Sequence, residues 1–147
     1  MIAKQLDRRQ VLKGLGAGAL AAGAAVTLAP TTALAHDAGV TGTWNIKIHP
    51  SGQATFPGVA TFAPGGVMSN TDGNSPSAGL GVWRGRPGGG FVFTFTTFDF
   101  SHGPPGVAVV VSGHGEVEGN SVHGSFKVSV GGTPAGVGTF DGTRMTV

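Results

Sequence analysis

The sequence predicts an all-β protein, a small eight-stranded antiparallel up-and-down barrel, with a two-sheet sandwich as the alternative. Residues 36–147 contain fifteen Val, twelve Thr and nine Phe, but one Leu, two Glu and one Gln. Branched and aromatic side chains pack well on a pleated sheet, whereas the long unbranched side chains that favour helices are nearly absent. Twenty-four Gly and eight Pro divide these residues into short runs, several of which alternate between apolar and polar side chains.

Eight runs are interpreted as strands because each is rich in branched or aromatic residues and is bounded by turn-forming residues. The first run alternates regularly, so Trp44, Ile46 and Ile48 share one face of its strand. Residues 63–66 form a turn between the second and third runs, and residues 71–77 form a polar loop. The predicted strands span residues 43–49, 58–62, 67–70, 80–84, 91–100, 107–118, 121–130 and 137–147.

The fifth predicted strand carries five phenylalanines that change phase along the strand. Phe91, Phe93 and Phe95 share one face, whereas Phe98 and Phe100 lie on the other face. A β-bulge between the two sets, or burial of both faces of the strand, would account for this pattern.

The sixth and seventh predicted strands form a hairpin whose register follows from its turn. If Gly119 and Asn120 are a two-residue turn, Glu116 faces His123, and His114 lies diagonally across from His123 on the same face. These three side chains are a candidate metal site or acid/base pair. The alternative is a solvated outer face that carries a single Glu–His pair.

The N-terminal segment resembles an export signal. Residues 7–13, with the order Asp-Arg-Arg-Gln-Val-Leu-Lys, are similar to the twin-arginine motif, and an apolar run of sixteen residues follows at 14–29. This run is shorter than the ~20 residues that a membrane-spanning helix needs, and residues 33–35 supply a small-x-small cleavage site. We therefore expect residues 1–35 to be a cleaved twin-arginine signal peptide and residues 36–147 to be one secreted or periplasmic domain. A retained membrane anchor is the alternative.

Charge and composition exclude several functional classes. Residues 36–147 carry five basic and six acidic side chains, a net charge of −1, so bulk charge does not favour a nucleic-acid partner. The absence of Cys excludes disulfides, thiolate nucleophiles and zinc fingers. Asp99, Ser101 and His102 are the residue types of a catalytic triad, but neighbours on one strand point to alternate faces and do not form the catalytic line.

Two short motifs carry a resemblance to the calycins, the lipocalin and avidin-like barrels. Gly42-Thr43-Trp44 resembles their G-x-W element, and Arg144 stands where those folds place a basic residue that packs across the Trp. Residues 61–66 and 81–83 also resemble a group of secreted bacterial barrel proteins of unsettled activity. The resemblance implies structural roles for Gly42, Trp44 and Arg144. A barrel of the allene-oxide-cyclase or dirigent type is the alternative.

The leading functional hypothesis is a barrel that binds a small apolar molecule, because eight strands enclose enough space for one small ligand. The candidate ligand contacts are Phe91, Phe93, Phe95 and Trp83. A core filled completely by phenylalanine is the competing interpretation. A cyclase or isomerase that holds an apolar substrate in the same interior is the enzymatic alternative.

A third hypothesis is copper binding at the mature N-terminus. Cleavage after Ala35 makes His36 the first residue, so its α-amine and imidazole would chelate one ion, and copper(II) favours such nitrogen ligands. An exposed terminus without a ligand is the alternative. The candidate partners are His49, His102, His114 and His123.

Overall fold

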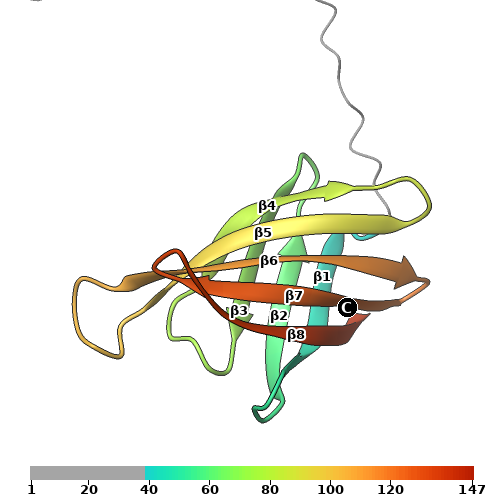
Figure 1. The fold of residues 1–147 in the computed structure, drawn as a ribbon. Helices are drawn as coiled ribbons and strands as arrows, with labels where there is room; N and C mark the ends of the chain where they lie inside the picture. Colours follow the sequence, from blue (N-terminus) through green and yellow to red (C-terminus); the bar gives the residue numbers. More distant parts are fainter. Residues whose placement is uncertain (1–38) are drawn as a thin grey trace, which may run out of the picture. The chain divides into compact units, whose positions relative to one another are not determined.

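Eight antiparallel strands form a closed barrel in the computed structural model, which describes residues 39–147 (Figure 1). Each strand pairs with the next along the chain and the last pairs with the first, so the topology is up-and-down. The predicted barrel is confirmed, and the sandwich alternative is wrong because the sheet closes on itself. No helix of this part of the chain is long and apolar enough to cross a membrane. The strands are β1 (Gly42–Pro50), β2 (Phe56–Phe62), β3 (Val67–Asp72), β4 (Gly79–Gly85), β5 (Gly90–Asp99), β6 (Val107–Glu118), β7 (Ser121–Val130) and β8 (Thr133–Arg144).

The strand boundaries differ from the sequence prediction at two places that matter for the site. β3 continues through Asp72, into the segment predicted as a polar loop. β8 begins at Thr133, four residues earlier than predicted, and a register irregularity between Val128 and Ser129 of β7 accommodates its first residues. The predicted signal peptide, residues 1–35, lies outside the described residues.

One end of the barrel is filled by large apolar side chains from the first five strands. Trp44, Phe62, Met68, Trp83 and Phe91 are all buried there. The rings of Phe62 and Phe91 meet edge-on, with 5.2 Å between their centroids, and Phe62 meets Trp83 in the same way at 5.9 Å. This end is therefore a solid hydrophobic core, and we call it the closed end.

Arg144 covers Trp44 at the closed end, as the calycin resemblance predicts. The guanidinium carbon lies 4.2 Å from the centroid of the Trp44 ring. The guanidinium also donates hydrogen bonds to the backbone carbonyl oxygens of Thr41, at 2.6 Å, and Gly39. Gly42 permits this arrangement because its φ of 127° is unfavourable for other residues, and an added Cβ would lie 2.9 Å from Nη1 of Arg144.

β5 is regular along its whole length, so the predicted bulge is wrong. Its ten residues pair with β6 in one unbroken register. Phe91 and Phe95 are buried inside the barrel, whereas Phe98 and Phe100 are 45% and 46% exposed. Burial of both faces is therefore also wrong. The rings of Phe98 and Phe100 therefore lie on the outer side, and those of Phe91, Phe93 and Phe95 lie on the inner side.

Candidate functional site

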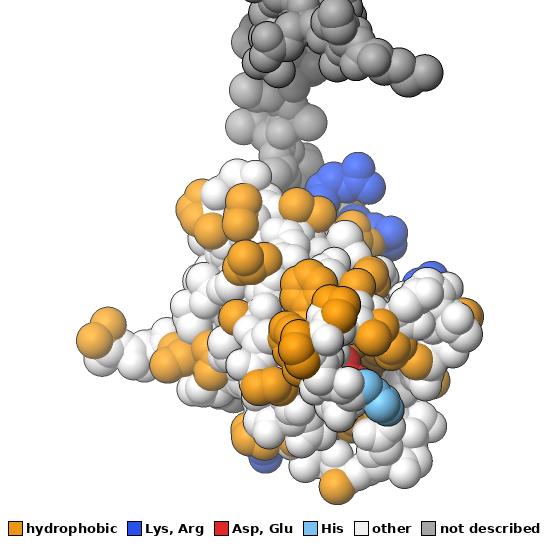
Figure 2. Space-filling view, turned by 90° about the vertical axis from the view of Figure 1, so that its left-hand side faces the viewer, with side chains coloured by type: hydrophobic (Ala, Val, Ile, Leu, Met, Phe, Trp, Pro, Cys, Tyr) orange, Lys and Arg blue, Asp and Glu red, His pale blue; other side chains and the backbone are white. Residues whose placement is uncertain are grey.

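The half of the barrel opposite the closed end contains a cavity of about 490 Å³, which we call the lumen. Its lining residues come from seven of the eight strands and from the connections that follow β1 and β3. These connections lie at the end away from Trp44 and Arg144, so the lumen opens there. Figure 2 faces the side on which the β5–β6 connection projects, and hydrophobic side chains gather near its centre.

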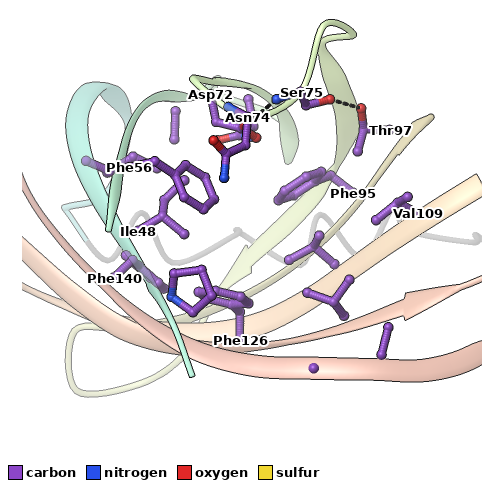
Figure 3. A pocket seen from close by; sticks show the side chains of 18 of the residues that line it. Ile48, Phe56, Asp72, Asn74, Ser75, Phe95, Thr97, Val109, Phe126 and Phe140 are labelled. Carbon is purple, nitrogen blue, oxygen red and sulfur yellow. Dashed lines mark hydrogen bonds between the residues drawn. The ribbon is translucent and has the colours of Figure 1, made fainter. Parts of the chain in front are cut away.

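Apolar side chains form most of the lumen wall because they occupy the alternate strand positions that point inward. Phe93 and Phe95 of β5 stack with 6.2 Å between ring centroids, and Phe140 of β8 meets Phe93 edge-on at 5.7 Å. Phe95, Phe126 and Phe140 surround the space in Figure 3. The other large apolar side chains at inward positions are Ile46, Ile48, Phe56, Phe62, Met68, Val109, Val111, Val122, Val128 and Val130. Phe98 and Val137 border the cavity from outward positions and are 45% and 59% exposed.

Glycines on neighbouring strands give these rings the room to lie against the barrel wall. Phe93 is paired with Gly113, and Phe140 with Gly124. A Cβ built on either glycine would lie 2.7 Å or 2.6 Å from the tip of its ring. Because the rings lie over glycine and not across the barrel axis, the interior stays open. The same relation holds between Phe91 and Gly115 and between Phe126 and Gly138. The Phe95 ring instead lies over Gly79, two residues from its register partner Gly81.

One side of the lumen is polar. Asp72, Asn74, Ser75 and Thr97 lie together on this side in Figure 3, across the cavity from Phe126 and Phe140. Backbone N–H groups of Asn74 and Ser75 donate to Oδ1 of Asp72, at 2.9 and 2.8 Å. The hydroxyls of Ser75 and Thr97 lie 3.2 Å apart, which ties the β3–β4 connection to β5. Asn70 completes this side; it is 5% exposed and its Nδ2 lies 3.4 Å from Oδ2 of Asp72.

The predicted ligand contacts divide into two pairs. Phe93 and Phe95 line the lumen, as the hypothesis requires. Phe91 and Trp83 do not line it, because they lie at the start of β5 and the end of β4, where both belong to the closed end. The indole N–H of Trp83 donates to the carbonyl oxygen of Ala63 at 2.9 Å, so its polar atom is already satisfied there.

Several lining residues were not among the sequence candidates. The sequence pattern could have identified Phe126 and Phe140 as inward residues, because each alternates with glycine on a strand rich in Val or Thr. Asn70 and Asp72 carry a weaker signal: they continue the alternation of Met68 along β3, but their polarity makes that segment resemble a loop.

The predicted patch on the β6–β7 hairpin lies on the outer surface. The register is confirmed: Glu116 pairs with His123 and His114 with Ser125. Nε2 of His123 lies 3.9 Å from a carboxylate oxygen of Glu116, with the two side chains 53% and 67% exposed. Glu118 also lies within ligand distance of this pair. His114 instead lies 3.3 Å from the Ser125 hydroxyl. The geometry is that of a solvated surface pair.

Asp99, Ser101 and His102 do not form a catalytic triad. The hydroxyl of Ser101 lies 3.0 Å from a carboxylate oxygen of Asp99 and 3.0 Å from Nδ1 of His102. The three side chains do meet, because residues 101–102 form a turn, but the serine stands between the other two. A triad requires the histidine in the middle. His36 lies outside the described residues, so copper binding there stays a prediction.

Hydrogen bonding shifts the ionisation of one lining carboxylate. The backbone N–H of Ser101, and then its hydroxyl, lower the pKa of Asp99 below the usual value. A carboxylate with a lowered pKa is a weak proton acceptor, which disfavours Asp99 as a general base.

No family model and no curated protein matches the sequence. The lumen, with its aromatic wall, its polar side and its open end, is the feature of the described residues on which a functional conclusion rests.

Proposed function

We propose that the protein is exported by the twin-arginine route and that its barrel binds a small apolar molecule in the lumen. The observation that carries the proposal is an open, mostly apolar cavity of about 490 Å³ inside a barrel whose other end is solid. Ligand sites are typically concave and apolar, with a few placed polar groups. A barrel that served only as a scaffold would gain stability by filling this space, because unfilled apolar volume lowers the stability of a core.

The expected affinity follows from the apolar surface that a ligand would bury. A ten-carbon chain gains about 8 kcal/mol at about 0.8 kcal/mol per buried CH₂ group. Lost translational and rotational freedom reduces this gain. The full gain would correspond to a dissociation constant of about 1 μM, so we expect a simple chain to bind more weakly than this.

The geometry of the lumen supports ligand binding better than it supports catalysis. A cyclase or isomerase needs an acid or base whose pKa is brought toward neutrality and which faces the substrate. Among the described lining residues, the carboxylate with a shifted pKa is Asp99, and the shift is downward.

The test is titration of residues 36–147 with N-phenyl-1-naphthylamine, an uncharged probe whose fluorescence rises in an apolar site. We expect saturable binding that Val109→Phe abolishes or weakens at least tenfold, because Val109 lines the lumen and a larger ring fills it. The matched control is Val82→Phe on the outer face, where Val82 is exposed; it should bind as the parent does. Equal binding by both variants, with folding verified by circular dichroism, would contradict the proposal.

A further inference from the structure

The polar side of the lumen holds a carboxylate in a fixed position. Both hydrogen bonds from the backbone N–H groups of Asn74 and Ser75 go to Oδ1 of Asp72, at 2.9 and 2.8 Å. Among residues 39–147, the hydrogen-bond partner of its other oxygen, Oδ2, is the distant Nδ2 of Asn70, at 3.4 Å. This contact is longer than an ordinary N–H···O hydrogen bond. Oδ2 therefore retains the capacity to accept a hydrogen bond from a ligand, and the carboxylate is oriented before the ligand arrives.

The charged side chains that line the lumen are acidic. Asp72 and Asp99 line it, and among the described lining residues none is Lys, Arg or His. An anionic head group would meet two negative charges and no cation. A cationic head group would meet complementary charges, which favours its binding selectively.

We propose that the lumen selects amphipathic amines: molecules with an ammonium group on an apolar body. This inference rests on the proposed function, since it takes the lumen as the binding site. The ammonium donates to Oδ2 of Asp72 at the polar side, near the side chain of Asn70. The apolar body packs against Phe93, Phe95, Phe126 and Phe140 and points toward the closed end.

The layout of the lumen fixes this orientation. Asp72 is the last residue of β3 and Asp99 the last of β5, so both carboxylates lie where the lumen opens. The interior beyond them is lined by aromatic and aliphatic side chains down to Phe62 and Met68. An amine whose head enters first would place its charge among apolar rings, far from either carboxylate.

The test compares three probes that share one ten-carbon chain: decylamine, decanol and decanoate. Each displaces N-phenyl-1-naphthylamine from residues 36–147 at pH 7 and concentrations below micelle formation. We expect decylamine to bind about tenfold more tightly than decanol and decanoate to bind more weakly than decanol. Asp72→Asn should lower the affinity for decylamine about tenfold and change that for decanol less than twofold. Asp141→Asn, which removes an exposed carboxylate on β8, is the matched control and should preserve the order.

The possible outcomes separate this inference from the proposed function. Equal affinity for the three probes, or tighter binding of decanoate, would overturn the amine selectivity while leaving an apolar site in place. Retention of the amine preference in a folded Asp72→Asn variant would also overturn it. Failure of all three probes and of the naphthylamine to bind would overturn both proposals. The comparison of head groups uses the parent protein, so it remains decisive even if Asp72→Asn does not fold.

Discussion

The guanidinium of Arg144 lies over the indole of Trp44, with its central carbon 4.2 Å from the ring centroid, and joins the two ends of the barrel sheet. The two residues are register partners on β8 and β1, the strands whose pairing closes the barrel. The guanidinium also holds the segment before β1 through the carbonyl oxygens of Thr41 and Gly39. The Arg144 side chain therefore stabilises both the closure of the sheet and the position of the segment before β1.

Replacing Arg144 tests this role. Arg144→Ala should lower the free energy of unfolding by about 1–3 kcal/mol, because it removes the stacking contact and leaves two carbonyl groups without their donor. Arg144→Lys should recover only part of the loss, since an ammonium lacks the planar fork. Urea denaturation measures both changes. Arg84→Ala, an exposed arginine on β4, is the control and should change stability by less than about 0.5 kcal/mol. A loss for Arg144→Ala no larger than the control would contradict the role.

The pairing of rings with glycine predicts an unusual sensitivity to a single methyl group. A Cβ on Gly79 would lie 2.5 Å from the ring of Phe95, so Gly79→Ala should destabilise the barrel by about 1–3 kcal/mol. Gly136→Ala is the matched control, because nothing lies within 4 Å of the added Cβ. It should be neutral or slightly stabilising, since alanine restricts the unfolded chain. Thermal unfolding of the two variants gives the comparison.

A second substitution tests whether the Phe95 ring causes the loss of stability in Gly79→Ala. In a Phe95→Leu background the aromatic contact is gone, so the added methyl of Gly79→Ala should cost less than in the parent. A double-mutant cycle should therefore give a favourable coupling energy of about 0.5–3 kcal/mol. Additive losses in the cycle would show that the glycine is required for a reason other than the ring.

The sequence determines the strands and one hairpin register because both depend on local rules. Alternation marks the inward face of β1, and the two-residue turn at residues 119–120 fixes the pairing of Glu116 with His123. Closure of the sheet is different. A barrel and a sandwich require the same alternation, so only the pairing of β1 with β8, which are far apart in the sequence, distinguishes them.

The sequence predicts only part of the lumen, for two physical reasons. A hydrophobic side chain can lie on the exposed face of a strand, so hydrophobicity alone does not identify the inward face. Phe98 therefore suggests a bulge, although it lies on the outer face. Inward polar side chains also break the apolar pattern. Asn70 and Asp72 make the end of β3 resemble a loop, so the sequence does not predict the polar side of the lumen.

Acidification should reveal the hydrogen bonds at the end of β5. The pKa of Asp99 is lowered by the backbone N–H of Ser101 and then by its hydroxyl. The stabilising contribution of Asp99 is therefore present above its unfolded pKa, about 3.9, and is lost as the pH falls through the lower folded pKa. An NMR titration of the Asp99 carboxyl should give a pKa below that reference. Ser101→Ala should raise this pKa only partly, because the backbone N–H remains. An unshifted carboxyl in the parent protein would contradict the hydrogen bonds.

The inward and outward phenylalanines of β5 should differ sharply in their contribution to stability. Phe91 is fully buried against Phe62 at the closed end, so Phe91→Ala removes a packed ring and leaves a cavity. We expect it to lower the free energy of unfolding by about 3–5 kcal/mol. Phe98→Ala should lower it by less than about 1 kcal/mol, because the Phe98 ring is half exposed on the outer face. Urea denaturation at a fixed protein concentration measures both losses. A loss for Phe98→Ala as large as that for Phe91→Ala would mean that the outer face of β5 is covered in solution, which the arrangement of the single chain does not predict.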